Sequence, residues 1–115
     1  MTVKLNANQA LSLWGGAITE SVRRESPDLS ARQMAVLMTV YLSQPPHTVR
    51  GLADQLNVSK PAITRALDRL SELGMIRRKT DDNDRRSVNI QRTVKGSVYL
   101  TEFAELIISS AGETD

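Results

Sequence analysis

Apolar residues recur every three or four positions through the first third of this 115-residue chain. Between residues 6 and 25 this spacing places one apolar stripe along a helix, formed by Leu11, Trp14, Ile18 and Val22. A second helix is predicted to begin at Ser30, whose side chain can cap the first turn while Gln33 reaches back to the Ser30 amide. It should end before Pro45 and Pro46.

The segment from Thr48 to Gly74 contains two shorter helical patterns around a tight corner. Their inner faces are formed by Val49, Leu52, Ala53 and Leu56, then by Ile63, Ala66, Leu67, Leu70 and Leu73. Asn57 turns the chain, Ser59 caps the second helix, and Gly74 is suited to end it. Two such helices joined by a turn of about four residues match the helix-turn-helix pattern.

After Gly74 the period changes, and residues 75–79 and 87–92 are predicted to form two short strands around a loop rich in Asp and Asn. A last helical stripe follows. The predicted fold is therefore mostly α with a small antiparallel β-hairpin: a winged helix-turn-helix with an additional helix at each end.

We predict a single domain over residues 1–115, because this length provides for one modest core. Within it, the winged helix-turn-helix should occupy residues 29–92. The terminal helices, 6–25 and 93–111, have more than one apolar column, to which Leu100 and Ile108 contribute. One core cannot cover both columns, so we expect these helices to be the dimerisation region of a homodimer.

Charge is distributed unevenly, although the net charge is only +2. Residues 48–95 hold eleven Lys and Arg against six Asp and Glu, whereas residues 96–115 hold four acids and no base. A basic centre is typical of a segment that meets an anion such as nucleic acid. Chance clustering on a solvated surface would explain the charge alone about equally well.

Several other classes of protein are disfavoured. No window approaches the roughly 18 apolar residues of a membrane span, and the first residues lack the apolar core of a secretory signal. Cysteine is absent, which excludes disulfides and fits a reducing cytoplasm. His47, the one histidine, follows two prolines and is expected to be an exposed turn residue. We expect no enzyme activity, no cofactor and no membrane association, and a cytoplasmic location.

The loop TDDNDRRSV, residues 80–88, crowds three acids into four positions. An EF-hand calcium loop requires Gly at its sixth position and Glu at its twelfth. Counted from Asp82, these positions hold Ser87 and Thr93, and two adjacent arginines would repel a cation. We therefore predict no metal site here, and we interpret the acids as turn residues at the tip of a hairpin.

The chain resembles the MarR family of bacterial winged-helix regulators. The resemblance runs without a gap over residues 29–96, through LSARQMAVLMTVYL, VRGLADQLNVSKPAITRALDRLSELGMIRR and DDNDRRSVNIQRTVKG. It implies a homodimeric transcription factor that binds a pseudo-palindromic operator in double-stranded DNA and is often released by a small ligand. It also implies that Arg86 enters the minor groove and that Asp84 orients it. Arg92 departs from the family pattern, which usually has an apolar strand residue there.

The helix after the corner is the candidate for the major groove. Its outward candidates are Ser59, Lys60, Pro61, Ala62, Thr64, Arg65 and Arg69. Arg65 is the first choice for a base contact, because a guanidinium can donate two parallel hydrogen bonds to guanine. Ser59 and Lys60 suit a phosphate. Asp68 is expected to pair with a nearby Arg instead.

The hairpin offers a second set of contacts, formed by Arg77, Asp84, Arg85 and Arg86. An Arg can enter the narrow minor groove, and a neighbouring carboxylate would restrict its rotamers before binding. The alternative is a winged-helix protein-interaction module whose basic wing binds an acidic partner. Trp14, Met38 and Tyr41 are candidates to line an effector pocket, although residues at helical spacing are more often plain core.

Overall fold

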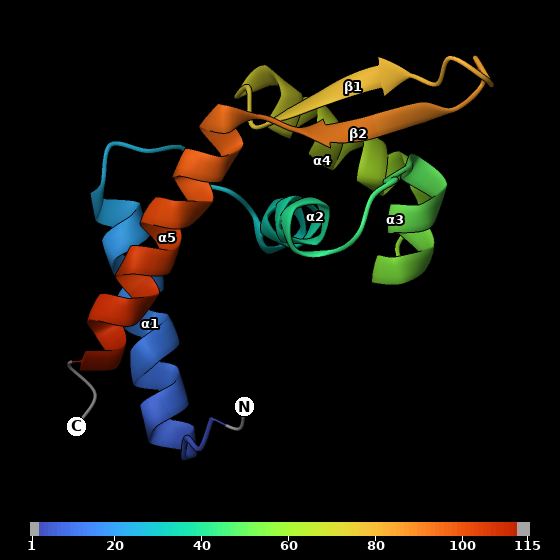
Figure 1. The fold of residues 1–115 in the computed structure, drawn as a ribbon. Helices are drawn as coiled ribbons and strands as arrows, with labels where there is room; N and C mark the ends of the chain where they lie inside the picture. Colours follow the sequence, from blue (N-terminus) through green and yellow to red (C-terminus); the bar gives the residue numbers. More distant parts are fainter. Residues whose placement is uncertain (1–2, 113–115) are drawn as a thin grey trace. The chain divides into compact units, whose positions relative to one another are not determined.

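A computed structural model of the chain describes residues 3–112, and Figure 1 shows its ribbon. Within this range the elements follow in the order α1 (Ala7–Arg23), α2 (Ala31–Leu42), α3 (Val49–Leu56), α4 (Lys60–Glu72), β1 (Ile76–Thr80), β2 (Val88–Arg92) and α5 (Val94–Gly112). Contacts divide the chain into two compact units. The central unit runs from Leu29 to Tyr99, and the terminal unit combines the residues up to Asp28 with those from Leu100 onward.

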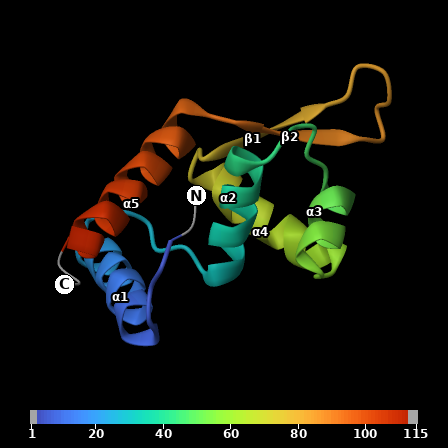
Figure 2. The same ribbon diagram turned by 60° about the horizontal axis from the view of Figure 1, so that its bottom comes forward.

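The central unit is a winged helix-turn-helix, as the sequence predicted. Figures 1 and 2 show α2, α3 and α4 grouped together, with the two strands extending past α3. The strands are antiparallel, with Ile76 opposite Arg92 and Thr80 opposite Val88. The largest fully buried side chains all come from this unit: Val36, Leu37, Val40, Leu52, Ile63, Leu67, Leu70 and Met75. We refer to β1, β2 and the loop between them as the wing.

The helices of the central unit begin where the sequence predicted. The Ser30 hydroxyl accepts a hydrogen bond from the Gln33 amide at 3.1 Å, and the Gln33 side chain accepts one from the Ser30 amide at 2.9 Å. The Ser59 hydroxyl likewise accepts from the Ala62 amide at 3.2 Å. The corner between α3 and α4 turns at Asn57, whose φ of 55° is a left-handed conformation that asparagine tolerates well.

The Tyr41 hydroxyl joins α2 to the segments on either side of the wing. It accepts a hydrogen bond from the Thr93 amide at 2.9 Å and lies 2.8 Å from the Met75 carbonyl oxygen, to which it can donate. Gly96 lies directly against this hydroxyl, so that a side chain there would collide with it. These contacts fix the place where the chain enters β1 and leaves β2.

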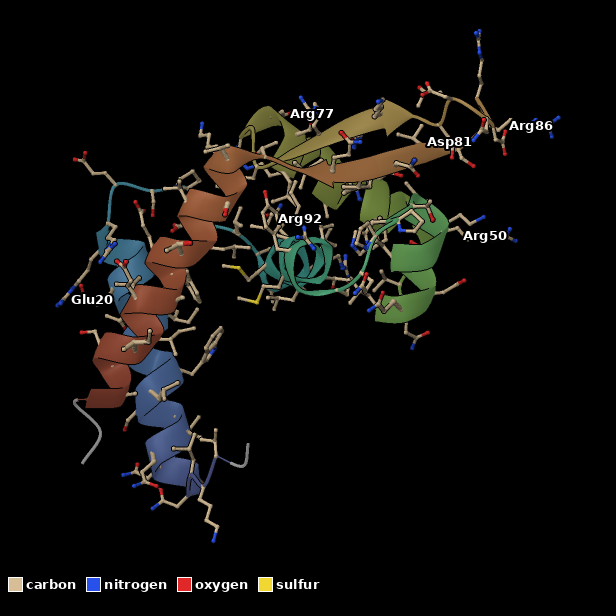
Figure 3. All side chains as sticks on the ribbon, in the orientation of Figure 1. Glu20, Arg50, Arg77, Asp81, Arg86 and Arg92 are labelled. Atoms are coloured by element: carbon tan, nitrogen blue, oxygen red, sulfur yellow. The ribbon has the colours of Figure 1, made fainter. Side chains whose placement is uncertain are left out.

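Arg92, the last residue of β2, is bonded through its side chain to the end of α2. Its Nε donates to the Val40 carbonyl at 3.0 Å, and its Nη2 donates to the Ser43 carbonyl at 3.2 Å. Both acceptors lie at the C-terminal end of α2, where carbonyl groups lack partners within the helix and a cation is favoured. Figure 3 shows the side chain reaching from β2 toward α2. Arg92 is therefore a helix cap supplied by a strand.

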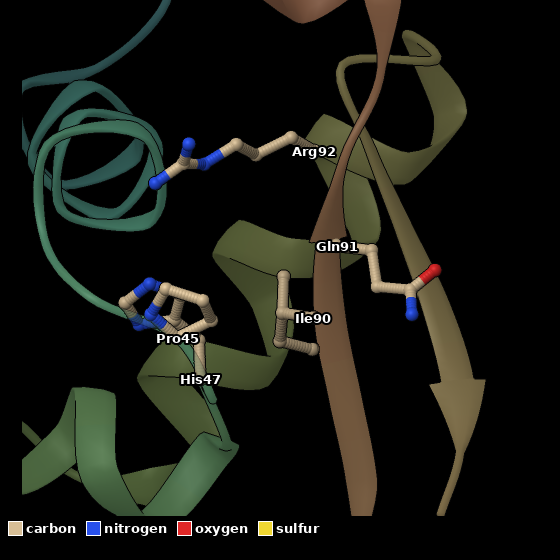
Figure 4. A pocket seen from close by; sticks show the side chains of 5 residues that line it. All are labelled: Pro45, His47, Ile90, Gln91 and Arg92. Carbon is tan, nitrogen blue, oxygen red and sulfur yellow. The ribbon is translucent and has the colours of Figure 1, made fainter.

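The expectation that His47 is an exposed turn residue was wrong. Only 7% of His47 is exposed, because its loop folds under β2 and its carbonyl accepts a hydrogen bond from the Ile90 amide at 2.8 Å. Figure 4 shows the imidazole beside Pro45 and facing Ile90 in a small pocket, which Gln91 and Arg92 complete. His47 is thus part of the support beneath the wing.

The terminal unit pairs α1 with the C-terminal part of α5. The Trp14 and Phe103 rings meet edge to face, with centroids 5.8 Å apart, and Ala17 is fully buried. Much of the apolar surface on the two helices remains exposed, including 72% of Leu11 and 71% of Ile108. None of the helices within residues 3–112 is long and apolar enough to cross a membrane.

Candidate nucleic-acid interface

The exposed face of α4 contains nearly all the residues that the sequence placed there. Ser59, Lys60, Pro61, Thr64, Arg65 and Arg69 are exposed. Ala62 is the exception, because it is only 6% exposed and belongs to the core. The expectation that Ala62 faces outward was wrong: it lies on the same side of the helix as Ile63 and Ala66, which are also buried.

The outer face of α4 is joined to the wing by Arg78. Its Nη2 donates to Asp68 Oδ1 at 2.7 Å and lies 3.3 Å from the Thr64 carbonyl oxygen. This confirms the expectation that Asp68 pairs with an arginine. Arg69 has an acidic neighbour as well, since its guanidinium lies 4.0 Å from the Glu72 carboxylate. Within residues 3–112, Arg65 and Lys60 have no ion-pair partner, so both cations are available for an anion.

The wing loop is organised by two aspartates that bind backbone amides. Asp81 Oδ1 accepts from the Asn83 amide at 2.8 Å, and Asp84 Oδ1 accepts from the Arg86 amide at 3.0 Å. The Asp84 carbonyl also accepts from the Ser87 amide at 3.0 Å. Two of the three acids, Asp81 and Asp84, therefore shape the turn, as the sequence suggested.

The expected side-chain pair between Asp84 and Arg86 is not formed. No ion pair joins these two residues in the part of the chain that the structure describes, because the carboxylate is turned toward the Arg86 amide. The Arg86 guanidinium extends outward from the tip of the wing (Figure 3). Arg77 and Arg85 are exposed as well. Asp84 therefore holds the backbone at Arg86 in place and does not orient the Arg86 guanidinium directly.

Two grooves flank the start of α4. One lies between α2 and α4 and is lined by Ser30, Arg32, Gln33, Ala62, Arg65 and Ala66. The other lies between α3, α4 and the wing and is lined by Thr48, Val49, Arg50, Lys60, Arg86, Ser87 and Val88. Basic side chains therefore border α4 on both sides. Among residues 3–112, no three His, Asp or Glu side chains are grouped so that they could hold a metal ion.

This arrangement of helices and wing is shared with known proteins. The sequence model of the MarR family matches residues 29–88, which is more than half of the chain. The chain belongs to the MarR family. The matched range covers α2, α3, α4, β1 and the wing loop, where all the candidate contacts lie.

Individual relatives agree with the MarR family assignment. The chain is 34% identical over 79 residues to the HTH-type transcriptional regulator PecS of Dickeya dadantii. That match covers 67% of this chain and 48% of PecS, so the chain spans about half the length of this curated relative.

Several solved structures share the fold. A mutant of S. aureus MepR has a TM-score of 0.73 at 22% identity, over 87% of this chain and 71% of that one. The transcriptional regulator BldR from Sulfolobus solfataricus has a TM-score of 0.64 at 30% identity, over 92% of this chain and 76% of that one.

Arg32 and Arg50 each line one of the two grooves, and the sequence pattern predicted neither of them as a contact. Each looks like an ordinary charged residue on a solvated helix face, since its sequence neighbours form no motif. Only folding brings Arg32 beside Arg65, and Arg50 beside Lys60 and the wing. The excess of basic residues between 48 and 95 is the one sequence signal that includes Arg50.

The three residues proposed for an effector pocket have different surroundings. Trp14 belongs to the terminal unit, where it packs against Phe103. Met38 and Tyr41 both lie on α2 in the central unit, and the Tyr41 hydroxyl is engaged with the backbone there. Tyr41 therefore has a structural role whether or not a ligand approaches it.

Proposed function

We propose that this protein is a transcriptional regulator that binds double-stranded DNA sequence-specifically as a homodimer. In this proposal α4 enters the major groove and Arg86 enters the adjacent minor groove. The observation that carries the proposal is the exposed face of α4, on the same unit as a wing that projects Arg86. On that face, Lys60 and Arg65 form no ion pair with any residue between 3 and 112. Membership of the MarR family supports it.

Arg65 and Thr64 are the proposed base-reading residues. Both are exposed on α4 away from the buried positions, and the Arg65 guanidinium has the two parallel donors that guanine accepts. Ser59 and Lys60 at the start of the helix, with Arg77 and Arg85 on the wing, are proposed phosphate contacts. Such contacts position the protein on the duplex but do not read its sequence.

The homodimer is proposed from the terminal unit. The apolar stripe of α1 is left largely uncovered within one chain, with exposed fractions of 72% for Leu11, 46% for Trp14 and 61% for Val22. A second copy would bury these side chains, at about 25 cal/mol per Å² of apolar area removed from water. Release by a small effector is a further part of the proposal, with Trp14, Met38 and Tyr41 as the residues to test.

A salt titration of binding to a mixed-sequence duplex tests the proposal. Binding that displaces counterions weakens linearly on logarithmic axes, with a slope of about −0.9 for each phosphate neutralised. We expect a slope of several such units for the unaltered protein and weaker binding for Arg65→Ala. Lys4→Ala is the matched control, because Lys4 is an exposed cation outside the helices proposed to dimerise.

Two outcomes would contradict the proposal. One is an absence of duplex binding at low salt, and the other is binding that changes little as salt rises. A protein that fails with DNA but binds an acidic polypeptide would instead be a winged-helix protein-interaction module.

A further inference from the structure

His47 lies in a short loop where three elements of the central unit meet. Its imidazole Nε2 lies 3.3 Å from the Ser43 carbonyl oxygen at the end of α2, to which an Nε2–H can donate. Its own carbonyl accepts a hydrogen bond from the Ile90 amide of β2 at 2.8 Å. The next residue, Thr48, caps α3 through its hydroxyl. The loop at His47 therefore links the end of α2, the middle of β2 and the start of α3.

The link to β2 lies at the level where the wing is also attached to α4. Ile90 is the partner of Arg78 in the antiparallel register of the two strands. Arg78 in turn donates to Asp68 on α4 at 2.7 Å. The same cross-strand pair is thus attached on both sides, by the His47 carbonyl at β2 and by Asp68 at β1. A loss of either attachment should let the wing move relative to α4.

The imidazole shares its acceptor with a cation. Arg92 Nη2 donates to the same Ser43 carbonyl oxygen at 3.2 Å, so the guanidinium and the imidazole are close neighbours. Figure 4 shows both side chains on the side of β2 that faces α2. The other residues that line this pocket are Pro45, Ile90 and Gln91, none of which is charged. An uncharged imidazole fits here, whereas a protonated one would place a second, largely buried positive charge beside Arg92.

The segments that contact His47 offer no carboxylate to balance such a charge. No acidic or basic residue stands between Arg32 and Arg50 in the sequence, so the end of α2, the loop and the first residue of α3 are neutral apart from His47 itself. On β2, the one charged residue is Arg92. Protonation of the imidazole would therefore meet repulsion from Arg92 without a compensating attraction.

We propose that His47 is a positioning residue for DNA binding, which holds the wing in place only while its imidazole is uncharged. Histidine is the side chain whose charge ordinarily changes between about pH 5 and 8. On protonation the imidazole leaves its place beside Arg92 and the loop loses its bond to Ile90. Arg86 at the wing tip is then no longer fixed relative to α4, and ordering it costs affinity. The proposal rests on the proposed function and deepens it, because it makes duplex binding dependent on pH.

The test compares the unaltered protein with His47→Gln on a mixed-sequence duplex, at constant salt, from about pH 8 to about pH 5.5. His47 is the only histidine in the chain, so the substitution removes that titration entirely. Gln keeps an amide donor for the Ser43 carbonyl but remains uncharged. We expect the unaltered protein to lose affinity several-fold as the pH falls, and His47→Gln to change little. General electrostatics predicts the opposite sign, because an added positive charge strengthens attraction to DNA.

A second measurement needs no DNA. Hydrogen exchange at the Ile90 amide reports on its bond to the His47 carbonyl. After correction for the intrinsic effect of pH on exchange, protection of Ile90 should fall on acidification in the unaltered protein and stay constant in His47→Gln. The amide of Ala17, which is buried in the terminal unit, is the control and should stay protected in both. Circular dichroism will verify folding, and His47→Asn is a second uncharged variant.

The failures of the two proposals can be told apart. If both proteins lose the same affinity on acidification, or if the unaltered protein binds more tightly, His47 does not position the wing and the proposed function stands. If Ile90 keeps its protection in acid, the role of His47 is wrong whatever the affinities show. If the unaltered protein does not bind duplex at any pH, the proposed function fails and the role of His47 in DNA binding fails with it.

Discussion

Arg78 on β1 donates a hydrogen bond of 2.7 Å to Asp68 on the outer face of α4. The link joins the wing to the helix proposed to read bases. If each element enters its own groove, their relative position has to be set before binding, because ordering them afterwards would cost affinity. We therefore propose that the Arg78–Asp68 pair positions the wing relative to α4, although a partly exposed ion pair contributes little to stability.

Asp68→Ala should weaken duplex binding even though it removes a negative charge. General electrostatics predicts the opposite, because a less acidic protein is attracted more strongly to DNA. The free energy of unfolding should fall by less than about 1 kcal/mol, since both side chains are partly exposed. Affinity measurements with Glu72→Ala provide the control, because Glu72 is an exposed acid on the same helix. If both variants bind more tightly, Asp68 does not position the wing.

Asp84→Asn and Asp84→Ala separate two ways in which Asp84 could act on Arg86. Asn keeps the side-chain oxygen that accepts from the Arg86 amide at 3.0 Å but loses the charge. We expect Asp84→Asn to retain duplex affinity and Asp84→Ala to lose several-fold, because only Ala removes the turn contact. Equal losses in the two variants would show that the charge of Asp84 acts on the guanidinium after all.

Arg92→Met should destabilise the protein by about 1 to 2 kcal/mol. The change keeps an apolar stem but removes the donors to the Val40 and Ser43 carbonyls, and charge-assisted hydrogen bonds contribute about that amount. Urea unfolding followed by circular dichroism measures it, with Arg24→Met as the control. If the two variants unfold at the same urea concentration, Arg92 does not cap α2.

Tyr41→Phe should cost about 1 to 3 kcal/mol of unfolding free energy, because it leaves the Thr93 amide and the Met75 carbonyl without their shared partner. Duplex affinity, measured under conditions where the variant is fully folded, should change little. A large loss of affinity without a loss of stability would contradict this purely structural role.

Local signals in the sequence were sufficient for most of the fold. Ser30 with Gln33 marked one helix start, Ser59 marked another, and the buried positions of α4 followed from their spacing. These features depend on residues within a few positions of each other, so periodicity and capping identify them. Ala62 was misplaced because it lies at the edge of the buried face, where spacing alone does not decide exposure.

The remaining features depend on contacts between distant segments. His47 is covered because β2 returns over it, and Arg92 finds its partners on a helix that ends about fifty residues earlier. Arg50, Lys60 and Arg86 border one groove although 36 positions separate the first from the last. No local sequence pattern indicates such contacts, so Arg32 and Arg50 could be recognised as part of the candidate interface only from the structure.

Selection of bound sites from a library of random duplexes tests the central claim most directly. A homodimer that inserts α4 into successive major grooves should enrich a pseudo-palindrome whose half-sites are about one helical turn apart, or a multiple of it. Arg65→Ala should lose preference at one position within each half-site. A library that remains random after repeated selection, although the protein is folded, would contradict sequence-specific recognition of DNA by this chain.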